Sequence, residues 1–223
     1  MLTNTRRFAA VAFSALALVA CGAAGGGTSS AENGSAAVTT DGELGHVKGN
    51  VDAPLTIIEY ASPTCPACKY FHDNVKPALE EKFISTGKVK FVFREYPLNE
   101  IDVAAYAMAR CAGEDKFFDV LDDLFANQDG VRYAAQNGVV KTTLGAIGQR
   151  HGIADKAAFD ACLANGDIRK QLADVYATSE KWGVDGTPTF IIDGVKQNFQ
   201  GEYTTAEGFV KQIEAKLAEK GVQ

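Results

Sequence analysis

The sequence has little of what marks several large protein classes. Basic residues are the minority, since 22 Lys and Arg stand against 28 Asp and Glu and give a formal net charge of −6. A nucleic-acid-binding surface requires a basic patch, so this balance argues against a nucleic-acid partner. Beyond residue 20 no apolar run is long enough to span a bilayer, and no internal repeat stands out. The 223 residues suffice for one sizeable core, or for one core with an added subdomain.

The first 21 residues have the pattern of an export signal. Arg6 and Arg7 precede an apolar stretch over 8–20, which is too short to span a bilayer. The stretch ends in LVAC, which resembles the lipobox of bacterial lipoproteins. The resemblance implies cleavage before Cys21 and a lipid on its thiol; an ordinary signal peptide cut elsewhere is the alternative. The TRR triplet resembles a twin-arginine signal only loosely, so the general secretory route is favoured.

A segment poor in large apolar side chains follows Cys21. Residues 22–41 are mostly Gly, Ala, Ser and Thr, which cannot bury enough apolar surface to order the chain, so we predict a flexible tether. It has no heptad pattern, which argues against a coiled-coil stalk and favours a monomer. We expect the protein in the bacterial cell envelope, on the periplasmic side, lipid-anchored to a membrane through Cys21.

Strand and helix patterns alternate in the next part of the chain. The runs LTIIEY at 55–60 and KVKFVFR at 88–94 are rich in β-branched and aromatic residues, which predicts two strands. The helical pattern between them extends to about residue 85 and contains Pro77, which should kink the helix. Strand, helix and strand predict a βαβ unit with a right-handed crossover.

A long helical pattern follows over 99–182. Asn99 and Asp115 are candidate caps at helix starts, and Gly113 and Gly130 are candidate helix ends.

Strand character then returns. The run TFIID at 189–193 and the run 195–199 flank an Asp-Gly pair, which predicts a hairpin. A last amphipathic helix is predicted from Thr205 to about residue 220. The order is therefore βαβ, a helical insertion, then ββα.

Four cysteines remain besides Cys21, and outside the cytosol their thiols can oxidise. They are Cys65, Cys68, Cys111 and Cys162, which allow three full pairings.

The first two form a CPAC motif directly after the first strand. Pro66 suits the first position of a helix, which places Cys65 at the N-cap, where free N–H groups and the helix dipole stabilise a thiolate. Cys68 lies one turn further on the same face, within reach of a disulfide. Thiol–disulfide exchange requires one reactive and one shielded sulfur. We therefore predict Cys65 as the exposed nucleophile and Cys68 as the buried resolving thiol.

Metal binding is the rival interpretation of this motif. Zinc usually takes four ligands, and Cys65, Cys68 and His72 offer three at most. Haem attachment would require histidine at position 69, which is Lys69. We expect neither a metal nor another cofactor.

Three runs, IIEYASPTCPAC, FREYPLN and WGVDGTPTF, resemble the DsbA-like branch of the thioredoxin superfamily over about residues 46–220. The resemblance implies an α/β thioredoxin fold (βαβ–ββα) with an inserted helical subdomain, and a thiol:disulfide oxidoreductase activity.

The corresponding division of the chain has five parts. We expect a signal peptide over 1–20 and a flexible tether after a lipidated cysteine over 21–45. The first half of the thioredoxin fold covers 46–98, the helical insertion 99–183, and the second half 184–223.

The resemblance also assigns roles outside the CPAC motif. It implies a cis-proline at Pro188 beside the motif, with Thr187 presenting its backbone to the substrate chain; a turn proline before an edge strand is the alternative. Glu59, in an otherwise apolar strand, is either a solvated edge residue or a buried proton acceptor. In the family a buried acid at this spacing shuttles the proton of the resolving thiol.

Cys111 and Cys162 lie in helical settings with apolar neighbours. Free buried thiols are one interpretation. One remaining pair in an oxidising compartment, within one subdomain, favours a structural disulfide, and similar pairs occur in some DsbA-like proteins.

The direction of exchange is less well determined. Isomerases of the superfamily usually have an N-terminal dimerisation stalk, which the tether does not resemble, whereas the strongest oxidases carry histidine where this chain has Ala67. We favour a dithiol oxidase that introduces disulfides into exported proteins and is reset by a membrane redox partner. The alternatives are an isomerase or reductase of the same fold, acting on exported proteins with free thiols or disulfides, or a non-enzymatic anchored copper carrier.

Overall fold

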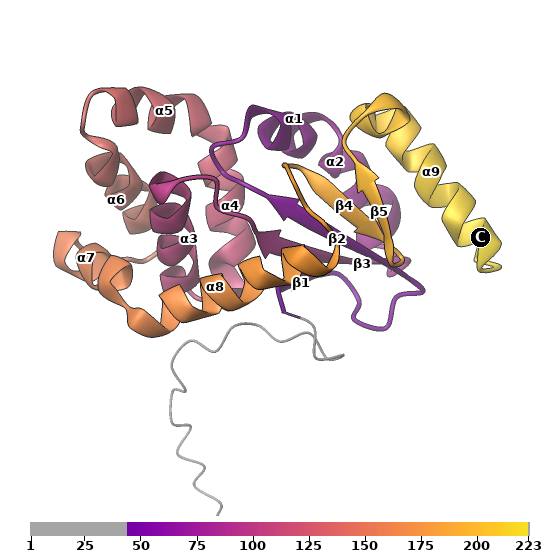
Figure 1. Ribbon diagram of the computed structural model, residues 1–223, viewed down its shortest axis with the longest axis horizontal. Helices are drawn as coiled ribbons and strands as arrows, with labels where there is room; N and C mark the ends of the chain where they lie inside the picture. Colours follow the sequence, from indigo (N-terminus) through magenta and orange to yellow (C-terminus); the bar gives the residue numbers. More distant parts are fainter. Residues whose placement is uncertain (1–43, 223) are drawn as a thin grey trace, which may run out of the picture. The chain divides into compact units, whose positions relative to one another are not determined.

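The computed structural model describes residues 44–222, and the strands in this part of the chain form one mixed sheet (Figure 1). Its order is β1-β3-β2-β4-β5, in which β2 and β3 run parallel and the other neighbours antiparallel. The strands are β1 (His46–Lys48), β2 (Leu55–Ala61), β3 (Val89–Glu95), β4 (Thr189–Ile192) and β5 (Val195–Asn198). Strand β1 has no counterpart among the predicted elements.

The connection from β2 to β3 is a broken helix. It consists of α1 (Pro66–Asn74), α2 (Lys76–Leu79) and a π-helical segment (Glu80–Ile84). The break falls at Val75, and Pro77 lies in the first turn of α2, where its missing N–H leaves no hydrogen bond unmade. The predicted kink at this proline is therefore confirmed.

The insertion between β3 and β4 is helical throughout. It contains α3 (Glu100–Ala112), a 3-10 turn (Glu114–Lys116), α4 (Phe117–Ala126), α5 (Gln128–Gln136), α6 (Val140–Arg150), α7 (Lys156–Ala164) and α8 (Gly166–Lys181). In Figure 1 the helices α3–α7 lie on one side of the sheet, and α8 brings the chain back to β4.

The predicted helix boundaries in the insertion are partly wrong. Asn99 caps α3 by accepting the N–H groups of Ile101 and Asp102, and Gly113 ends this helix at a φ of 104°. Asp115 caps no helix, because it lies inside the 3-10 turn before α4. Gly130 ends no helix, because it lies within α5, where its φ is not positive and the helical hydrogen bonds continue.

The second half of the fold follows its local sequence signals. Asp193 and Gly194 take positive φ values of 51° and 81°, which suit a two-residue hairpin turn between β4 and β5. After a 3-10 turn (Gly201–Thr204), Thr205 caps α9 (Ala206–Glu219) by accepting the N–H of Gly208.

The helices and one face of the sheet share a single apolar core. Its largest cluster joins Phe91 and Phe93 of β3 to Phe71 of α1 and Phe117 of α4. The other face carries a smaller cluster around Ile58, Tyr60, Val92 and Ile191. A βαβ–ββα sheet with a helical insertion in the same core confirms the predicted thioredoxin fold.

The first described residues already belong to the fold. The carbonyl of Leu44 accepts a hydrogen bond of 2.7 Å from Arg94 Nε, and the adjacent Gly45 is buried against β3, although both were assigned to the tether. Cys21 and the predicted signal peptide lie outside the described residues. No helix in 44–222 is both long and apolar enough to cross a membrane.

Candidate active site

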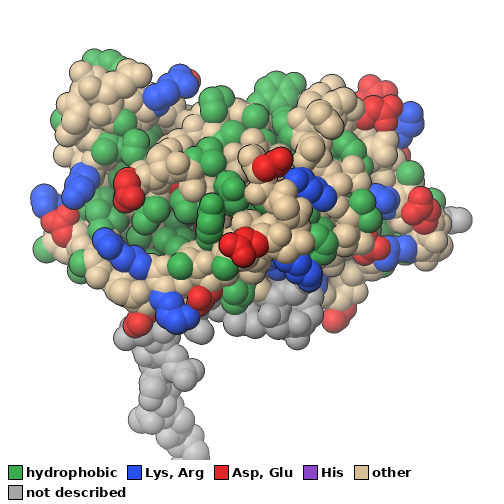
Figure 2. Space-filling view, in the orientation of Figure 1, with side chains coloured by type: hydrophobic (Ala, Val, Ile, Leu, Met, Phe, Trp, Pro, Cys, Tyr) green, Lys and Arg blue, Asp and Glu red, His purple; other side chains and the backbone are tan. Residues whose placement is uncertain are grey.

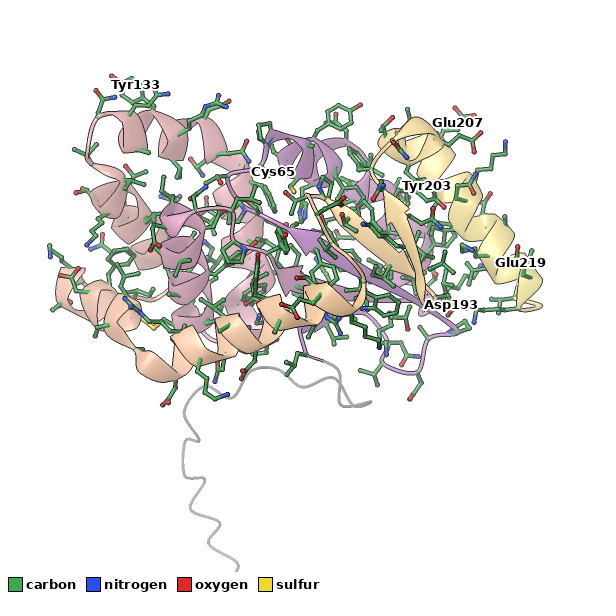
Figure 3. The ribbon with its side chains drawn as sticks, in the orientation of Figure 1. Cys65, Tyr133, Asp193, Tyr203, Glu207 and Glu219 are labelled. Carbon is green, nitrogen blue, oxygen red and sulfur yellow. A yellow bond between two sulfur atoms is a disulfide. The ribbon has the colours of Figure 1, made fainter. Side chains whose placement is uncertain are left out.

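Cys65 begins helix α1, at the end of the loop that leaves β2 (Figure 3). It is the N-cap, with Pro66 next to it, and its Sγ accepts the N–H of Cys68 at 3.4 Å. Neither thiol is in a disulfide, so the structure shows the dithiol form. Cys68 is fully buried, as predicted, but Cys65 exposes only 7% of its surface and is less accessible than predicted.

The two thiols differ in acidity because their surroundings differ. Hydrogen bonding from the Cys68 thiol outweighs burial and lowers the pKa of Cys65 to about 6, with a smaller contribution from backbone N–H groups. Burial raises the pKa of the Cys68 thiol well above its usual value, and the charges of Cys65 and Glu59 raise it further. At neutral pH Cys65 is therefore mainly a thiolate and Cys68 a thiol.

A loop from the second half of the fold lies against Cys65. The Thr187–Pro188 peptide bond is cis, and Cys65 in its thiol form donates to the carbonyl of Thr187 at 3.3 Å. The side-chain hydroxyl of Thr187 is buried and has no hydrogen-bond partner among the described residues. Residues far apart in the sequence thus meet at one sulfur atom.

Glu59 lies on the central strand β2 and is fully buried, which decides between its two predicted environments. Its Oε2 atom lies 3.1 Å from Nε2 of His72 on α1. Sequence reasoning does not single out His72 as a partner of this acid. The available signal is its spacing, since His72 lies four residues after Cys68 and therefore on the same face of the helix.

The helical insertion supports the active-site loop through Asp102. This fully buried carboxylate accepts hydrogen bonds from Ser62 Oγ at 2.7 Å and from the N–H of Thr64 at 3.1 Å. It also accepts the N–H of Leu98 at 2.8 Å, so one charged side chain joins the loop before Cys65 to the loop before α3.

Gln128 of α5 supports the same loop from another direction. Its side-chain amide donates to the carbonyl of Pro63 at 2.7 Å and to that of Cys65 at 2.9 Å, and it exposes only 3% of its surface. Neither Gln128 nor Asp102 carries a recognisable motif in the sequence. The helical insertion therefore helps to position Cys65 and the loop before it.

Apolar side chains are exposed around this site. Tyr70 on α1 is 48% exposed and Leu98, in the loop held by Asp102, is 51% exposed. Figure 2 shows hydrophobic atoms gathered in the middle of one face, with charged side chains scattered around them. Among residues 44–222 no group of three or more His, Cys, Asp and Glu side chains forms a possible metal site.

The second cysteine pair lies within the insertion. Cys111 of α3 and Cys162 of α7 form a disulfide with a Cα–Cα distance of 5.9 Å, seen as a yellow bond in Figure 3. The bond joins two helices of the insertion and contributes no atom to the CPAC site.

The comparisons with known proteins agree with this geometry. A family model described as Thioredoxin matches residues 41–215, which is most of the chain. The chain belongs to the thioredoxin family. A Rickettsia bellii protein named as a protein-disulfide oxidoreductase is 32% identical over 151 residues, covering 67% of this chain and 57% of the relative. This thioredoxin-family chain thus spans little more than half the length of that relative.

Solved structures place this member of the thioredoxin family in its DsbA-like branch. The crystal structure of Wolbachia pipientis alpha-DsbA1 is 26% identical, with a TM-score of 0.60 over 77% of this chain and 89% of the other. BdbD from Bacillus subtilis, in its oxidised form, is 23% identical with a TM-score of 0.67, covers 78% of this chain and 93% of that one, and shares the fold.

Proposed function

We propose that this protein is an envelope thiol:disulfide oxidoreductase that acts as a dithiol oxidase on exported proteins. The opposite acidities of Cys65 and Cys68 carry the proposal. A stabilised Cys65 thiolate favours the reduced form, which makes the Cys65–Cys68 disulfide an oxidant. The DsbA-like relatives support the same chemistry.

The reaction proceeds through a mixed disulfide. A thiolate of the exported protein attacks Cys65 Sγ of the oxidised pair, and the Cys65–Cys68 bond breaks as Cys68 leaves and takes up a proton. A second thiolate of the substrate then attacks the substrate sulfur of the mixed disulfide, and Cys65 leaves as a thiolate. The substrate loses two electrons and the CPAC pair gains them. A disulfide-bearing membrane partner accepts these electrons and restores the pair.

The substrate segment contacts the Thr187–Pro188 loop in this proposal. An extended chain that pairs with the backbone of Thr187 brings its sulfur to Cys65, because the Thr187 carbonyl already lies 3.3 Å from Cys65 Sγ. Tyr70 and Leu98 supply exposed apolar surface beside it for substrates that are not yet folded.

The location in the envelope rests on the N-terminal sequence. A signal peptide over 1–20, a lipid on Cys21 and the tether that follows it hold the enzyme, as a monomer, at a membrane on the periplasmic side. Mass spectrometry of the mature N-terminus tests this part. A first residue other than a lipid-modified Cys21 contradicts it.

The redox state of Cys65 and Cys68 in cells tests the direction of exchange. Rapid acid quenching and alkylation should find the pair mainly oxidised, as an oxidase requires. A mainly reduced pair would instead identify an isomerase or a reductase. Stoichiometric copper in the purified reduced protein, without thiol exchange, would identify the anchored metal carrier.

A further inference from the structure

Every turnover moves a proton to or from a sulfur atom that has no contact with solvent. Cys68 is fully buried, yet it takes up a proton when it leaves the disulfide and loses one when the disulfide forms again. During both steps a substrate or redox partner is bonded to Cys65, the member of the pair that has exposed surface. The proton therefore needs a route that does not pass Cys65.

The charge of Glu59 raises the pKa of Cys68, and Glu59 in turn pairs with His72. Its Nε2 atom is 3.1 Å from Glu59 Oε2, and its side chain is 3% exposed. The ring stacks on Phe125 of α4, with centroids 4.0 Å apart, and meets Phe93 edge-on at 6.2 Å. These contacts hold the imidazole in one orientation, with its second nitrogen directed away from Glu59.

That second nitrogen lies toward Asp122 of α4. His72 Nδ1 is 3.8 Å from Asp122 Oδ1, which is longer than a hydrogen bond, and the Asp122 side chain is 48% exposed. A cavity of about 170 Å³ opens here between α1, α2 and α4, and His72, Asp122 and Lys76 are among its lining residues. The imidazole thus joins a buried acid at one nitrogen to a solvent-accessible hollow at the other.

Two buried atoms at this pair have no hydrogen-bond partner among residues 44–222. They are Glu59 Oε1 and His72 Nδ1. Unpaired buried polar atoms destabilise a fold, so they need a reason. Here each is the atom at which a proton would enter or leave the pair.

We propose that His72 relays the proton of Cys68 between Glu59 and the crevice beside Asp122. This inference rests on the proposed function, which supplies the need for the proton. When the CPAC disulfide forms, the Cys68 proton passes to Glu59, and His72 gives its Nδ1 proton to water in the crevice. Cys68 then attacks Cys65 Sγ, the Cys65–Cys68 bond forms, and the partner leaves as a thiolate.

The charge of the buried pair does not change in this exchange. Before it the pair is a carboxylate and an imidazolium, and after it a carboxylic acid and a neutral imidazole. When a substrate attacks the oxidised protein, the flow reverses: the leaving Cys68 takes the proton of Glu59, and His72 takes one from the crevice. A relay that keeps the net charge constant avoids leaving an isolated charge in the core.

The charged groups around His72 act on its pKa in opposite directions. Burial lowers the pKa of His72, but Glu59 on β2 and Asp122 on α4 outweigh it, and the pKa is raised overall although the charge of Lys76 opposes them. Lys76 itself is held by Asp122 and by Glu80, each at 3.0 Å. The carboxylates beside His72 thus favour a bound proton on its ring, and neutralising Glu59 would weaken that preference.

The test separates the two steps by which oxidised glutathione oxidises the dithiol protein. Quenched-flow analysis follows first the attack of Cys65, which forms the mixed disulfide, and then ring closure by Cys68. For His72→Gln we expect the first step to stay within about twofold of the unchanged protein. Ring closure should slow by at least about tenfold, a modest share of the roughly 10²–10⁴-fold that general acid–base catalysis supplies.

A matched control and a rescue distinguish proton transfer from a structural role. His151→Gln makes the same change in a histidine that also pairs with an aspartate, Asp123, at 2.9 Å, and should leave both steps unchanged. His72→Ala enlarges the crevice, and added imidazole should restore its ring closure, with a rate that rises with the concentration of neutral imidazole.

The outcomes separate this inference from the proposed function. Normal ring closure in His72→Gln at every pH overturns the relay and leaves the oxidase intact. Equal slowing of both steps, without rescue by imidazole, makes His72 a structural residue and also overturns the relay. Absence of thiol exchange in the unchanged protein overturns the proposed function itself.

Discussion

The two cysteine pairs of this protein consist of the same side chains, but their surroundings differ. Cys65 and Cys68 lie three residues apart at a helix N-terminus, where one sulfur receives hydrogen bonds and the other is buried beside an acid. Cys111 and Cys162 are 51 residues apart and join two packed helices. The comparison shows that an exchange site needs two thiols of unequal acidity, whereas a structural crosslink needs only two elements to hold together.

Removing one sulfur of the CPAC pair should have the largest effect on thiol exchange. Cys65→Ser should reduce thiol exchange to the uncatalysed rate, because no other thiol in residues 44–222 is both unbonded and acidic. Cys68→Ala should instead accumulate mixed disulfides through Cys65, because the resolving thiol is gone. Non-reducing gels with mass spectrometry measure both. Mixed disulfides in Cys65→Ala but not in Cys68→Ala would reverse the assigned roles.

The second pair should give the opposite result. Replacing Cys111 and Cys162 together by alanine opens a loop of 51 residues, which the chain-entropy model values at about 4 kcal/mol of unfolding free energy. We expect the melting temperature to fall by roughly 10 °C while exchange with glutathione stays unchanged. A double variant that loses exchange while folded would show that the two pairs are coupled.

Gln128→Ala removes two hydrogen bonds to the loop that carries Cys65 and leaves the Cys111–Cys162 disulfide in place. It leaves the carbonyl of Pro63 without its donor, and that of Cys65 with the N–H of Lys69 alone, which should lower the unfolding free energy by about 2 kcal/mol. Gln136→Ala, at an exposed position of the same helix, is the matched control and should change it little. Urea unfolding of the dithiol forms measures both. Equal effects of the two variants would mean that the contact with the active-site loop contributes nothing.

The smallest expected effect concerns the acidity of Cys65. Its pKa of about 6 lies between the roughly 3.5 of DsbA and the roughly 7 of thioredoxin. Backbone N–H groups, that of Ala67 included, lower it, but the Ala67 side chain adds neither charge nor hydrogen bond. Ala67 is exposed, so Ala67→His fits without repacking and should lower the Cys65 pKa by about one unit. The change favours the reduced form by about 1.4 kcal/mol and raises the reduction potential by about 30 mV.

Thiolate absorbance against pH and equilibration with glutathione give these two quantities. In the unchanged protein the thiolate signal should rise with pH and reach half its final value near pH 6. Unchanged values in Ala67→His would point to Thr187 or Glu59 as the source of the redox behaviour.

The elements that could be predicted from the sequence are those defined by residues close together in the chain. The CPAC helix start, the Asp-Gly hairpin and the parallel strands β2 and β3 were predictable, because each depends on residues close together in the chain. Strand β1 was not, since three residues carry no period and pair with β3 only in the folded state. Gly130 was assigned wrongly because glycine is tolerated inside a helix that tertiary contacts stabilise.

Some residues of the candidate active site could be predicted from the sequence, and others could not. Cys65 and Cys68 are marked by their spacing, but the contact of Glu59 with His72 joins a strand to a helix and has no local signature. Asp102 and Gln128 are ordinary polar residues of amphipathic helices until the fold brings them to the active-site loop. Such contacts depend on which face of each helix is turned inward, and that is determined by packing.

The hydrogen bonds of Asp102 bear on protein engineering. A minimal thioredoxin scaffold given the CPAC tetrapeptide would copy the sulfurs but lack the carboxylate that holds Ser62 and Thr64 ahead of them. A transplant that aims to keep the geometry of this loop must therefore carry helix α3 together with the motif. The smallest unit that could be transferred with its supporting contacts intact is a pair of subdomains.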